Sequence, residues 1–452
     1  MTFFSYPLHP RVLLYFSACV YALASPQLWS QTPSSQPWNL EQLNQPPQYR
    51  WLDEQSPVRS LIYTGETYSG NATEVFAYYA SPNTLASATS LDVLKQPEVF
   101  EQPDVLEQPD TVTKPAIAEP IVHGKFPGVV LIHGGGGTAF SEWTELWAKR
   151  GYAAIAMDLA GARPIEGKNP HQAENRTRLE HGGPDQGDAE KFGSIDKPAN
   201  QQWPYHAVAN VVLAHSLLRS FPEVDAELTA VTGISWGGYL TCIVAGVDQR
   251  FDAAVPVYGC GFLHENSAWL PQFAGMTDAQ RTQWIELWDP SQYLPRATMP
   301  LLFVNGTNDF AYPLDSYMKS FDCVPERPGA PKQLCVTVNM PHGHPPGWAP
   351  QEIGLFIDQC LHDGRSLPVV GQPQLNKDQV SAPLLGDTPV ESAELHFTTD
   401  TTPINQRQWT TLPAVVAAGQ VLAAAPPTTT TAWFFTVKDD RGAVISTRVV
   451  LP

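Results

Sequence analysis

Residues 231–239 read Val-Thr-Gly-Ile-Ser-Trp-Gly-Gly-Tyr and contain a G-x-S-x-G pattern centred on Ser235. The first residues are typical of the end of a buried strand, and residues 239–245 suit a helix. A serine on a sharp strand-to-helix turn needs small neighbours, because side chains at Gly233 and Gly237 would collide where the two elements meet. The stretch therefore predicts a nucleophile elbow. A glycine-rich turn capped by a serine is the alternative interpretation of the pattern alone.

Apolar strands alternate with helical stretches on both sides of this elbow. Near-continuous apolar runs of this kind indicate a mainly parallel sheet with helices on both faces, that is, an α/β domain. We place this domain at residues 126–365. The predicted strands are 128–133, 153–157, 228–232, 253–257, 301–304 and 334–338, and the clearest helices are 207–220 and 352–361.

Five further segments complete the predicted organisation. Residues 1–24 resemble a signal peptide, with Arg11 before an apolar run and Ala22-Leu23-Ala24 as a cleavage site. Residues 25–125 are expected to form an N-terminal wrap with edge strands near 60–63 and 75–79, interrupted at 82–124 by an acidic, proline-rich insertion. A polar excursion at 158–205 is expected to roof the active site. Residues 366–452 predict a small antiparallel β-sandwich of immunoglobulin or fibronectin III type.

The composition excludes some classes of partner. The formal net charge of −18 and the lack of basic runs argue against nucleic acid, which is bound mainly through clustered Lys and Arg. We see no transmembrane segment after the signal. We therefore expect a secreted or periplasmic protein. A lipid anchor at Cys19 is a weaker alternative, because Phe16 stands where a lipoprotein box usually has Leu.

Five cysteines remain after removal of the signal, so they cannot all pair with one another. Cys323 and Cys335 are the best candidates for a disulfide, because their spacing closes a short loop before a strand. Buried free thiols are the alternative interpretation. None of the cysteines has C-x-x-C spacing, the histidines lack metal-ligand spacing, and we expect neither a metal nor a cofactor.

Ser235 needs an orienting carboxylate and a base, and candidates follow it in the order Ser, Asp, His. Asp309 comes just after the strand at 301–304. His342 and His344 both follow the strand at 334–338. We favour His344 as the base, because a loop of five or six residues can swing back over Ser235, and keep His342 as the alternative.

The run His133-Gly134-Gly135-Gly136-Gly137 follows a buried strand. Glycines leave backbone N–H groups uncovered, so Gly134 and Gly135, with the N–H of Trp236, are the predicted oxyanion hole. A dinucleotide-binding loop is the rival interpretation, but the G-x-G-x-x-G spacing is absent.

These motifs carry a family resemblance over residues 126–361. The chain resembles an α/β-hydrolase of the acetyl xylan esterase, cephalosporin-C deacetylase and dienelactone hydrolase-like group, which borders on the prolyl oligopeptidase catalytic domain. The matching motifs are HGGGG at 133, GISWGG at 233, GTND at 306 and the Gly-His pair at 343. The resemblance implies Ser235 as nucleophile, Asp309 as orienter and His344 as base, the second histidine being a departure from the simpler pattern.

We therefore expect a secreted serine carboxylic ester hydrolase that acts through an acyl-enzyme on a small-molecule or oligosaccharide ester, and a carbohydrate deacetylase is the specific activity that we expect. Trp203 and Tyr205 are candidates for stacking on a sugar, although large aromatic residues are more often buried. A serine peptidase of the prolyl oligopeptidase type is the second hypothesis. The third is a non-catalytic surface protein that binds carbohydrate.

Overall fold

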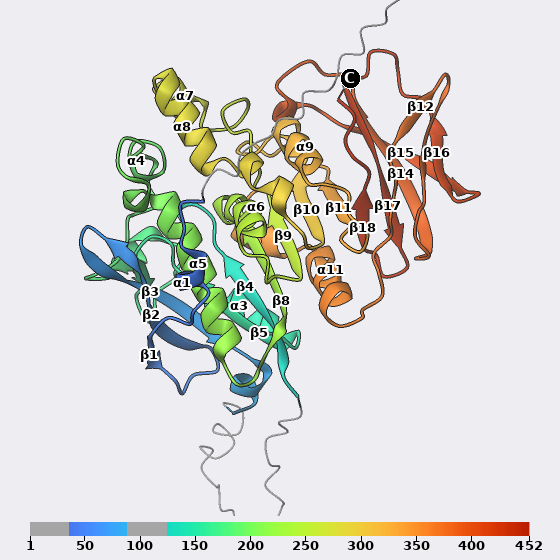
Figure 1. Cartoon of the computed structure of the whole chain (residues 1–452). Coiled ribbons are helices and arrows are strands. Elements are labelled where there is room, and N and C mark those ends of the chain that lie inside the picture. Colours follow the sequence, from blue (N-terminus) through green and yellow to red (C-terminus); the bar gives the residue numbers. More distant parts are fainter. Residues whose placement is uncertain (1–35, 88–123, 452) are drawn as a thin grey trace, which may run out of the picture. The chain divides into compact units, whose positions relative to one another are not determined.

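The computed structural model describes residues 36–87 and 124–451 (Figure 1). The predicted signal peptide, Cys19 and most of the proline-rich insertion lie outside the described residues. At the start of that insertion, residues 82–87 are helical. In the described parts of the chain, no helix combines the length and the apolar character needed to cross a membrane.

Six parallel strands form the centre of the sheet, in the spatial order β5-β4-β8-β9-β10-β11. Almost every residue in the apolar runs is buried, as expected for strands covered on both faces. The order reverses at β4, because the chain next adds β5 on one side and later β8 on the other. These strands confirm the predicted α/β fold. Their bounds are β4 (Phe126–Ile132), β5 (Ala153–Met157), β8 (Val224–Ile234), β9 (Ala253–Val257), β10 (Leu301–Gly306) and β11 (Lys332–Thr337).

Three antiparallel strands extend one edge of this sheet. They are β1 (Tyr49–Asp53), β2 (Arg59–Tyr68) and β3 (Asn71–Ala80), and β3 pairs with β5. The edge strands predicted at 60–63 and 75–79 are thus present as β2 and β3, and each strand is longer than the predicted segment. Just before β1, the buried Trp38 donates its indole N–H to Tyr205 O at 2.9 Å, which ties the N-terminal segment to the main domain.

Helices cover both faces of the parallel sheet. Right-handed crossovers place α3, which leads from β4 to β5, on the opposite face from α5, which leads back from β5 to β8. Helix α6 packs beside α5, and every one of its residues is buried. The principal helices are α3 (Ser141–Lys149), α5 (Trp203–Ser220), α6 (Trp236–Val247), α8 (Asp278–Trp288), α9 (Leu314–Cys323) and α11 (Gln351–Leu361); shorter ones are α1 (Leu40–Leu43), α4 (Asp188–Lys191), α7 (Leu270–Ala274) and α10 (His344–Trp348).

The C-terminal region is strand-rich and antiparallel, as predicted, and it continues the catalytic sheet. Strand β18 pairs with β11 through Ser446 and Leu334, so the sheet shows no break at the predicted boundary near 365 (Figure 1). Beyond β18 the order is β17-β14-β15-β16-β13-β12. The bounds are β12 (Gln374–Asn376), β13 (Gln379–Pro383), β14 (Val390–Thr398), β15 (Thr410–Ala417), β16 (Gln420–Ala424), β17 (Ala432–Asp439) and β18 (Val444–Ser446).

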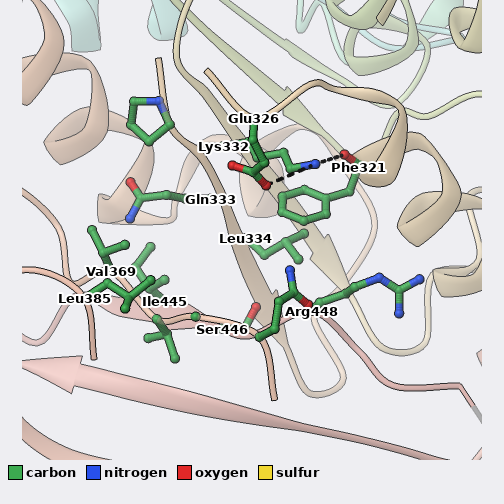
Figure 2. Close-up of a pocket in the computed structure, with 14 residues that line it drawn as sticks. Phe321, Glu326, Lys332, Gln333, Leu334, Val369, Leu385, Ile445, Ser446 and Arg448 are labelled. Carbon is green, nitrogen blue, oxygen red and sulfur yellow. Dashed lines mark hydrogen bonds and ion pairs between the residues drawn. The ribbon is translucent and has the colours of Figure 1, made fainter. Parts of the chain in front are cut away.

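A cavity of about 430 Å³ lies where these C-terminal strands meet β11. Lys332, from the start of β11, donates to the Phe321 carbonyl at 3.1 Å and pairs with Glu326 at 3.5 Å; Figure 2 marks both interactions with dashed lines. Lys332 lies at the amino end of its strand, whereas Asp309 and His342 follow the carboxyl ends of β10 and β11. This cavity is therefore separate from the predicted catalytic residues.

The predicted disulfide between Cys323 and Cys335 is wrong. All five cysteines in the described residues are free, and Cys335 is buried within β11 while Cys323 ends α9. Short spacing in the sequence does not bring the two sulfur atoms together. Cys323 is the last residue of a helix, whereas Cys335 is buried in a strand of the sheet.

Candidate active site

Ser235 lies between β8 and α6, on the turn that the sequence predicts. Its backbone has φ of 60° and ψ of −118°, an unfavourable conformation for a residue with a side chain. The Ser235 N–H donates to Val257 O at 2.8 Å, which holds the turn against the end of β9. The turn thus presents the half-buried Ser235 hydroxyl at the carboxyl end of the sheet.

The glycines of the elbow are required by close contact. A Cβ on Gly237 would lie 2.0 Å from Ile132 O and 2.7 Å from His133 O, both backbone atoms at the end of β4. A Cβ on Gly233 would lie 2.2 Å from Gly237 O. The first turn of α6 can therefore approach β4 only without side chains at these positions.

Replacing Gly237 with Ala should reduce the free energy of unfolding by at least about 3 kcal/mol, because backbone atoms must move to admit the methyl group. Gly275→Ala is the matched control. The nearest atom to its Cβ would be at an ordinary 3.5 Å, and its φ of −75° suits alanine. Urea denaturation followed by circular dichroism measures both changes. Equal stabilities for the two variants would contradict the steric argument.

Asp309 is buried in the loop after β10. Its Oδ1 accepts hydrogen bonds from the N–H groups of Ala311 at 2.9 Å and Tyr312 at 2.7 Å. The other oxygen, Oδ2, lies 2.7 Å from Nδ1 of His342. Because Oδ1 is held by the backbone, the carboxylate presents Oδ2 to the imidazole in one orientation.

His342 bridges the serine and the aspartate. Its Nε2 lies 3.0 Å from Ser235 Oγ, and its Nδ1 faces Asp309. A carboxylate at Nδ1 requires the proton there, so Nε2 is left free to accept the serine proton. The ring stacks on Tyr258, with centroids 4.5 Å apart, and Phe310 lies 5.1 Å away on another side. The three side chains thus have the hydrogen-bond geometry that a serine nucleophile, its base and an orienting carboxylate require.

The preference for His344 over His342 needs correction, because the loop after β11 turns back sooner than expected. Asn339 has φ of 58° and donates its N–H to Thr307 Oγ1 at 3.1 Å, so the chain reverses two residues beyond the strand. The Tyr258 hydroxyl then donates to Pro341 O at 2.7 Å and anchors the loop. His342 is thereby already beside Ser235.

His344 begins α10 and points elsewhere. Its Nε2 accepts the N–H of Gly134 at 2.9 Å, and its ring lies 4.7 Å from that of Phe140. Burial lowers the pKa of His344 to about 3, so the ring is neutral near pH 7 and able to accept this bond. His344 therefore supports the glycine loop.

The predicted oxyanion donors differ in availability. The Gly134 N–H is already bonded to His344, although Gly134 does approach Ser235: a Cβ on it would lie 3.0 Å from Ser235 Cβ. The N–H groups of Gly135 and Trp236 have no hydrogen-bond partner within the described part of the chain. These two amides, rather than that of Gly134, are free to bind an oxygen.

Side chains of the excursion at 158–205 donate hydrogen bonds to carbonyl groups of the glycine loop. Arg176 Nη1 donates to Gly136 O at 2.6 Å and to Gly137 O at 3.0 Å, and Gln186 Nε2 donates to Gly137 O at 2.9 Å. With these carbonyls bound to the excursion, the loop is fixed beside Ser235. The residues of this excursion are thus part of the site, although their roles carried no sequence motif.

Two buried polar residues anchor the same region. His133 Nε2 accepts the N–H of Leu159 at 2.9 Å, so Nδ1 carries the proton that is donated to Gly134 O at 2.8 Å. Burial lowers the pKa of His133 to about 4, which keeps this tautomer neutral. Asp158 accepts the hydroxyl of Thr138 at 2.7 Å. These contacts join the glycine loop to the start of the excursion.

Trp203 and Tyr205 do not present faces to a ligand, contrary to the sequence-based expectation. Trp203 is 1% exposed and donates its indole N–H to Leu159 O at 2.7 Å. Tyr205 is 6% exposed, stacks on Trp38, and bonds to Glu66 at 3.0 Å. Both lie in the first turn of α5, which the core encloses.

Three residues near the site escaped the sequence analysis: Tyr258, Phe310 and Lys191. Tyr258 directly follows β9, a position from which strand counting could have found it. Phe310 is 60% exposed beside His342, next to Asp309 in sequence. Lys191 lies within the irregular excursion, and no pattern marked it. Within the described ranges, no group of three or more potential ligands is placed to hold a metal ion.

The family comparison matches the middle of the chain. A model of the prolyl oligopeptidase family (Peptidase_S9) matches residues 182–351, which include Ser235, Asp309 and His342. The match therefore covers the elbow and the loops that carry the other two residues, and leaves the N-terminal strands and the C-terminal region outside.

Two curated relatives and one solved structure resemble the chain. The uncharacterized peptidase YuxL of Bacillus subtilis is 26% identical over 244 residues, covering 49% of this chain and 32% of the relative. The acetyl esterase Axe7A of Xylanibacter ruminicola is 25% identical over 207 residues, covering 44% and 46%. The chain thus spans less than half the length of these relatives. An acetyl xylan esterase from Paenibacillus sp. R4 superposes with a TM-score of 0.49 at 18% identity, covering 72% of this chain and 92% of that one.

The sheet order, the strained serine elbow and the family match agree with one another. The chain therefore has the α/β-hydrolase fold with a serine elbow, and its residues 182–351 are similar to the prolyl oligopeptidase family.

Proposed function

We propose that the protein is a carboxylic ester hydrolase that works through an acyl-enzyme, with Ser235 as nucleophile, His342 as general base and Asp309 as the orienting carboxylate. The observation that carries this proposal is the hydrogen-bond chain through His342, with 3.0 Å to Ser235 and 2.7 Å to Asp309. The first distance allows direct proton transfer from Ser235 to His342. The second allows Asp309 to stabilise the positive charge on the imidazole.

In acylation, Ser235 Oγ attacks the ester carbonyl carbon while its proton passes to His342 Nε2. The carbonyl oxygen becomes an oxyanion in the tetrahedral intermediate. When the intermediate collapses, the bond to the alcohol oxygen breaks, and the imidazolium returns its proton to that oxygen. Asp309 stabilises the positive charge that His342 carries between these two transfers.

In deacylation, water takes the place of the alcohol. His342 accepts a proton from water, the resulting oxygen nucleophile attacks the acyl carbon, and the bond to Ser235 Oγ breaks. The proton returns to Oγ, so the products are the free acid and the unchanged enzyme. The N–H groups of Gly135 and Trp236 are the proposed donors to the oxyanion in both steps, because they are the unoccupied amides beside Ser235.

We propose acetylated carbohydrate as the substrate. The similarity to a relative named as an acetyl esterase supports a short acyl group. Phe310 supplies an exposed aromatic face next to His342, where a sugar ring of the alcohol portion can stack. Export follows from the predicted signal at residues 1–24 and is part of the same proposal.

Asp309→Asn should lower kcat by roughly 10⁴-fold with little loss of stability. The backbone donors of Ala311 and Tyr312 keep the amide oxygen at the position of Oδ1, so the amide nitrogen faces His342. That nitrogen cannot accept from Nδ1, and the imidazole adopts the wrong tautomer. Kinetics with p-nitrophenyl acetate measures the effect, and wild-type kcat in this variant would contradict the assignment.

A serine peptidase is the second candidate, and the match to the prolyl oligopeptidase family favours it. Purified protein should be assayed on p-nitrophenyl acetate, acetylated xylo-oligosaccharides, and aminoacyl and prolyl p-nitroanilides. The esterase proposal expects hydrolysis of the esters, with anilide cleavage at least about 100-fold slower. Faster cleavage of the anilides would replace it with the peptidase.

A further inference from the structure

Lys191 is a buried lysine at the edge of the catalytic site. It ends α4 within the excursion and is 5% exposed. Its Nζ lies 4.5 Å from the ring centroid of Trp236, the residue after Ser235, and 5.2 Å from that of Trp203. It also approaches the glycine loop: a Cβ on Gly135 would lie 3.5 Å from this nitrogen. The cation thus adjoins both residues whose amides are free.

Among the described residues, Lys191 Nζ makes no hydrogen bond and no ion pair, and it lies against the faces of Trp203 and Trp236. The nitrogen is not among the polar atoms that are both fully buried and unpaired, so it is accessible to a ligand. The neighbouring carboxylates do not pair with it: Asp188 accepts from Gln272 at 2.9 Å, and Asp185 accepts its neighbour's backbone N–H at 2.6 Å. A lysine whose side chain is almost wholly enclosed, but whose nitrogen has no protein partner, can form charge-assisted hydrogen bonds with an anionic ligand.

A second cation, Arg176, lies at the same glycine loop, and carboxylates lie near both cations. The Arg176 guanidinium donates hydrogen bonds to the backbone carbonyls of Pro170, Gly136 and Gly137. The carboxylates of Asp158 and Glu174 act on its charge, but neither forms an ion pair with it in the described residues. The chain as a whole carries a formal charge of −18 and repels anions at long range. The two cations at this loop are therefore a local feature of a chain that is acidic as a whole.

We propose that Lys191 is a specificity residue that binds a carboxylate on the substrate, so the enzyme prefers esters whose acyl or alcohol portion is anionic. The inference rests on the proposed ester hydrolysis at Ser235. In a carbohydrate substrate the anionic group is the carboxylate of a uronic acid. The rings of Trp203 and Trp236 keep Nζ in place, and the carboxylate completes its charge-assisted hydrogen bonds.

The pH dependence of this preference follows from the surroundings of Lys191. Burial lowers its pKa from 10.5 to about 8, against the opposing effect of nearby carboxylates. The lysine is charged below this value and neutral above it, so kcat/KM for an anionic ester relative to a neutral one should fall as pH rises from 7 to 9. The charged or titratable groups around it are Asp185, Asp188 and Glu190 of the excursion and His133 at the end of β4.

The test uses matched substrates on each side of the scissile bond. For the alcohol side, 4-acetoxybenzoate is compared with 4-acetoxybenzamide. For the acyl side, mono-4-nitrophenyl adipate is compared with the corresponding adipamate. We expect wild-type kcat/KM to favour the anionic member of at least one pair by about 10- to 100-fold, the range of one charge-assisted hydrogen bond. Equal rates within both pairs would overturn the proposal.

Two variants separate recognition of the anion from packing. Lys191→Met keeps the chain length and apolar contact but removes the charge, and should abolish the preference while changing neutral-ester hydrolysis by less than about threefold. Lys191→Arg should retain part of the preference. If Lys191 only supports Trp236, then Lys191→Met will slow the anionic and neutral esters equally, and the proposal fails.

A binding measurement distinguishes this inference from the catalytic proposal. Calorimetry with the Ser235→Ala variant should give tighter binding of the anionic member of the favoured pair, and Ser235→Ala combined with Lys191→Met should bind both members alike. A binding preference that depends on Lys191 in a protein that hydrolyses neither ester would contradict the hydrolase proposal alone. Equal binding in Ser235→Ala, with both esters hydrolysed by the wild type, would contradict the role of Lys191 alone.

Discussion

Ser235→Ala should reduce kcat/KM for p-nitrophenyl acetate by about 10⁴- to 10⁶-fold, or roughly 5 to 8 kcal/mol of transition-state stabilisation. The hydroxyl is the atom that forms the acyl-enzyme, and alanine fits the same turn without its Oγ. The remaining rate should come from substrate binding and the free amides of Gly135 and Trp236, which alanine leaves in place.

Ser220→Ala serves as the matched control. Ser220 ends α5, at the opposite end of that helix from Trp203, and its hydroxyl caps Leu217 O at 2.6 Å. Its removal should leave activity unchanged. Circular dichroism and the urea midpoint should show that Ser235→Ala is folded. Substantial acetate release by a folded Ser235→Ala protein, well above the rate without enzyme, would exclude the acyl-enzyme mechanism at this serine.

His342→Ala should cause a loss similar to that of Ser235→Ala, about 10⁴- to 10⁶-fold in kcat. Without the imidazole, the Ser235 hydroxyl loses its acceptor at 3.0 Å, and Asp309 Oδ2 loses its partner at 2.7 Å. The double variant of Ser235 and His342 should be little worse than either single variant, because the two side chains act in one step.

His344→Ala is the informative control, because this histidine lies two residues away and was the candidate preferred from the sequence. It should lower kcat by no more than about tenfold, through loosening of the loop when the Gly134 N–H loses its acceptor. Esterase kinetics of both variants over a range of pH separates the two roles. A greater loss in His344→Ala than in His342→Ala would show that the loop rearranges during catalysis and reverses the assignment.

Most of the fold was predictable because the signals are local. Near-continuous apolar strands alternating with helices indicate a buried parallel sheet, and the short glycine-flanked turn at Ser235 indicates the elbow. The edge strands β2 and β3 were likewise predictable, because the alternation of side chains in these segments is typical of strands. The continuation of the sheet from β11 into β18 was not, because pairing of Leu334 with Ser446 depends on distant segments that carry no common pattern.

The choice between the two histidines shows why the site was only partly predictable. The spacing places both in one loop after a strand, and spacing alone does not say where that loop turns. The turn depends on the left-handed conformation of Asn339 and on the bond from Tyr258 to Pro341 O, a contact between residues 83 positions apart. The burial of Trp203 and Tyr205 was unpredictable for the same reason. It depends on contacts with distant segments of the chain, such as those with Leu159 and Trp38.

The amino-acid sequence by itself determined the fold class, the serine elbow and the order in which candidate catalytic residues occur, because these depend on periodicity, on glycine's size and on the succession of strands. Only the tertiary structure decided which histidine faces Ser235, which amides of the glycine loop stay free, and that Lys191 stands unpaired beside Trp236. These features are contacts between loops from different strands, and such contacts form only when the sheet brings the carboxyl ends of those strands together.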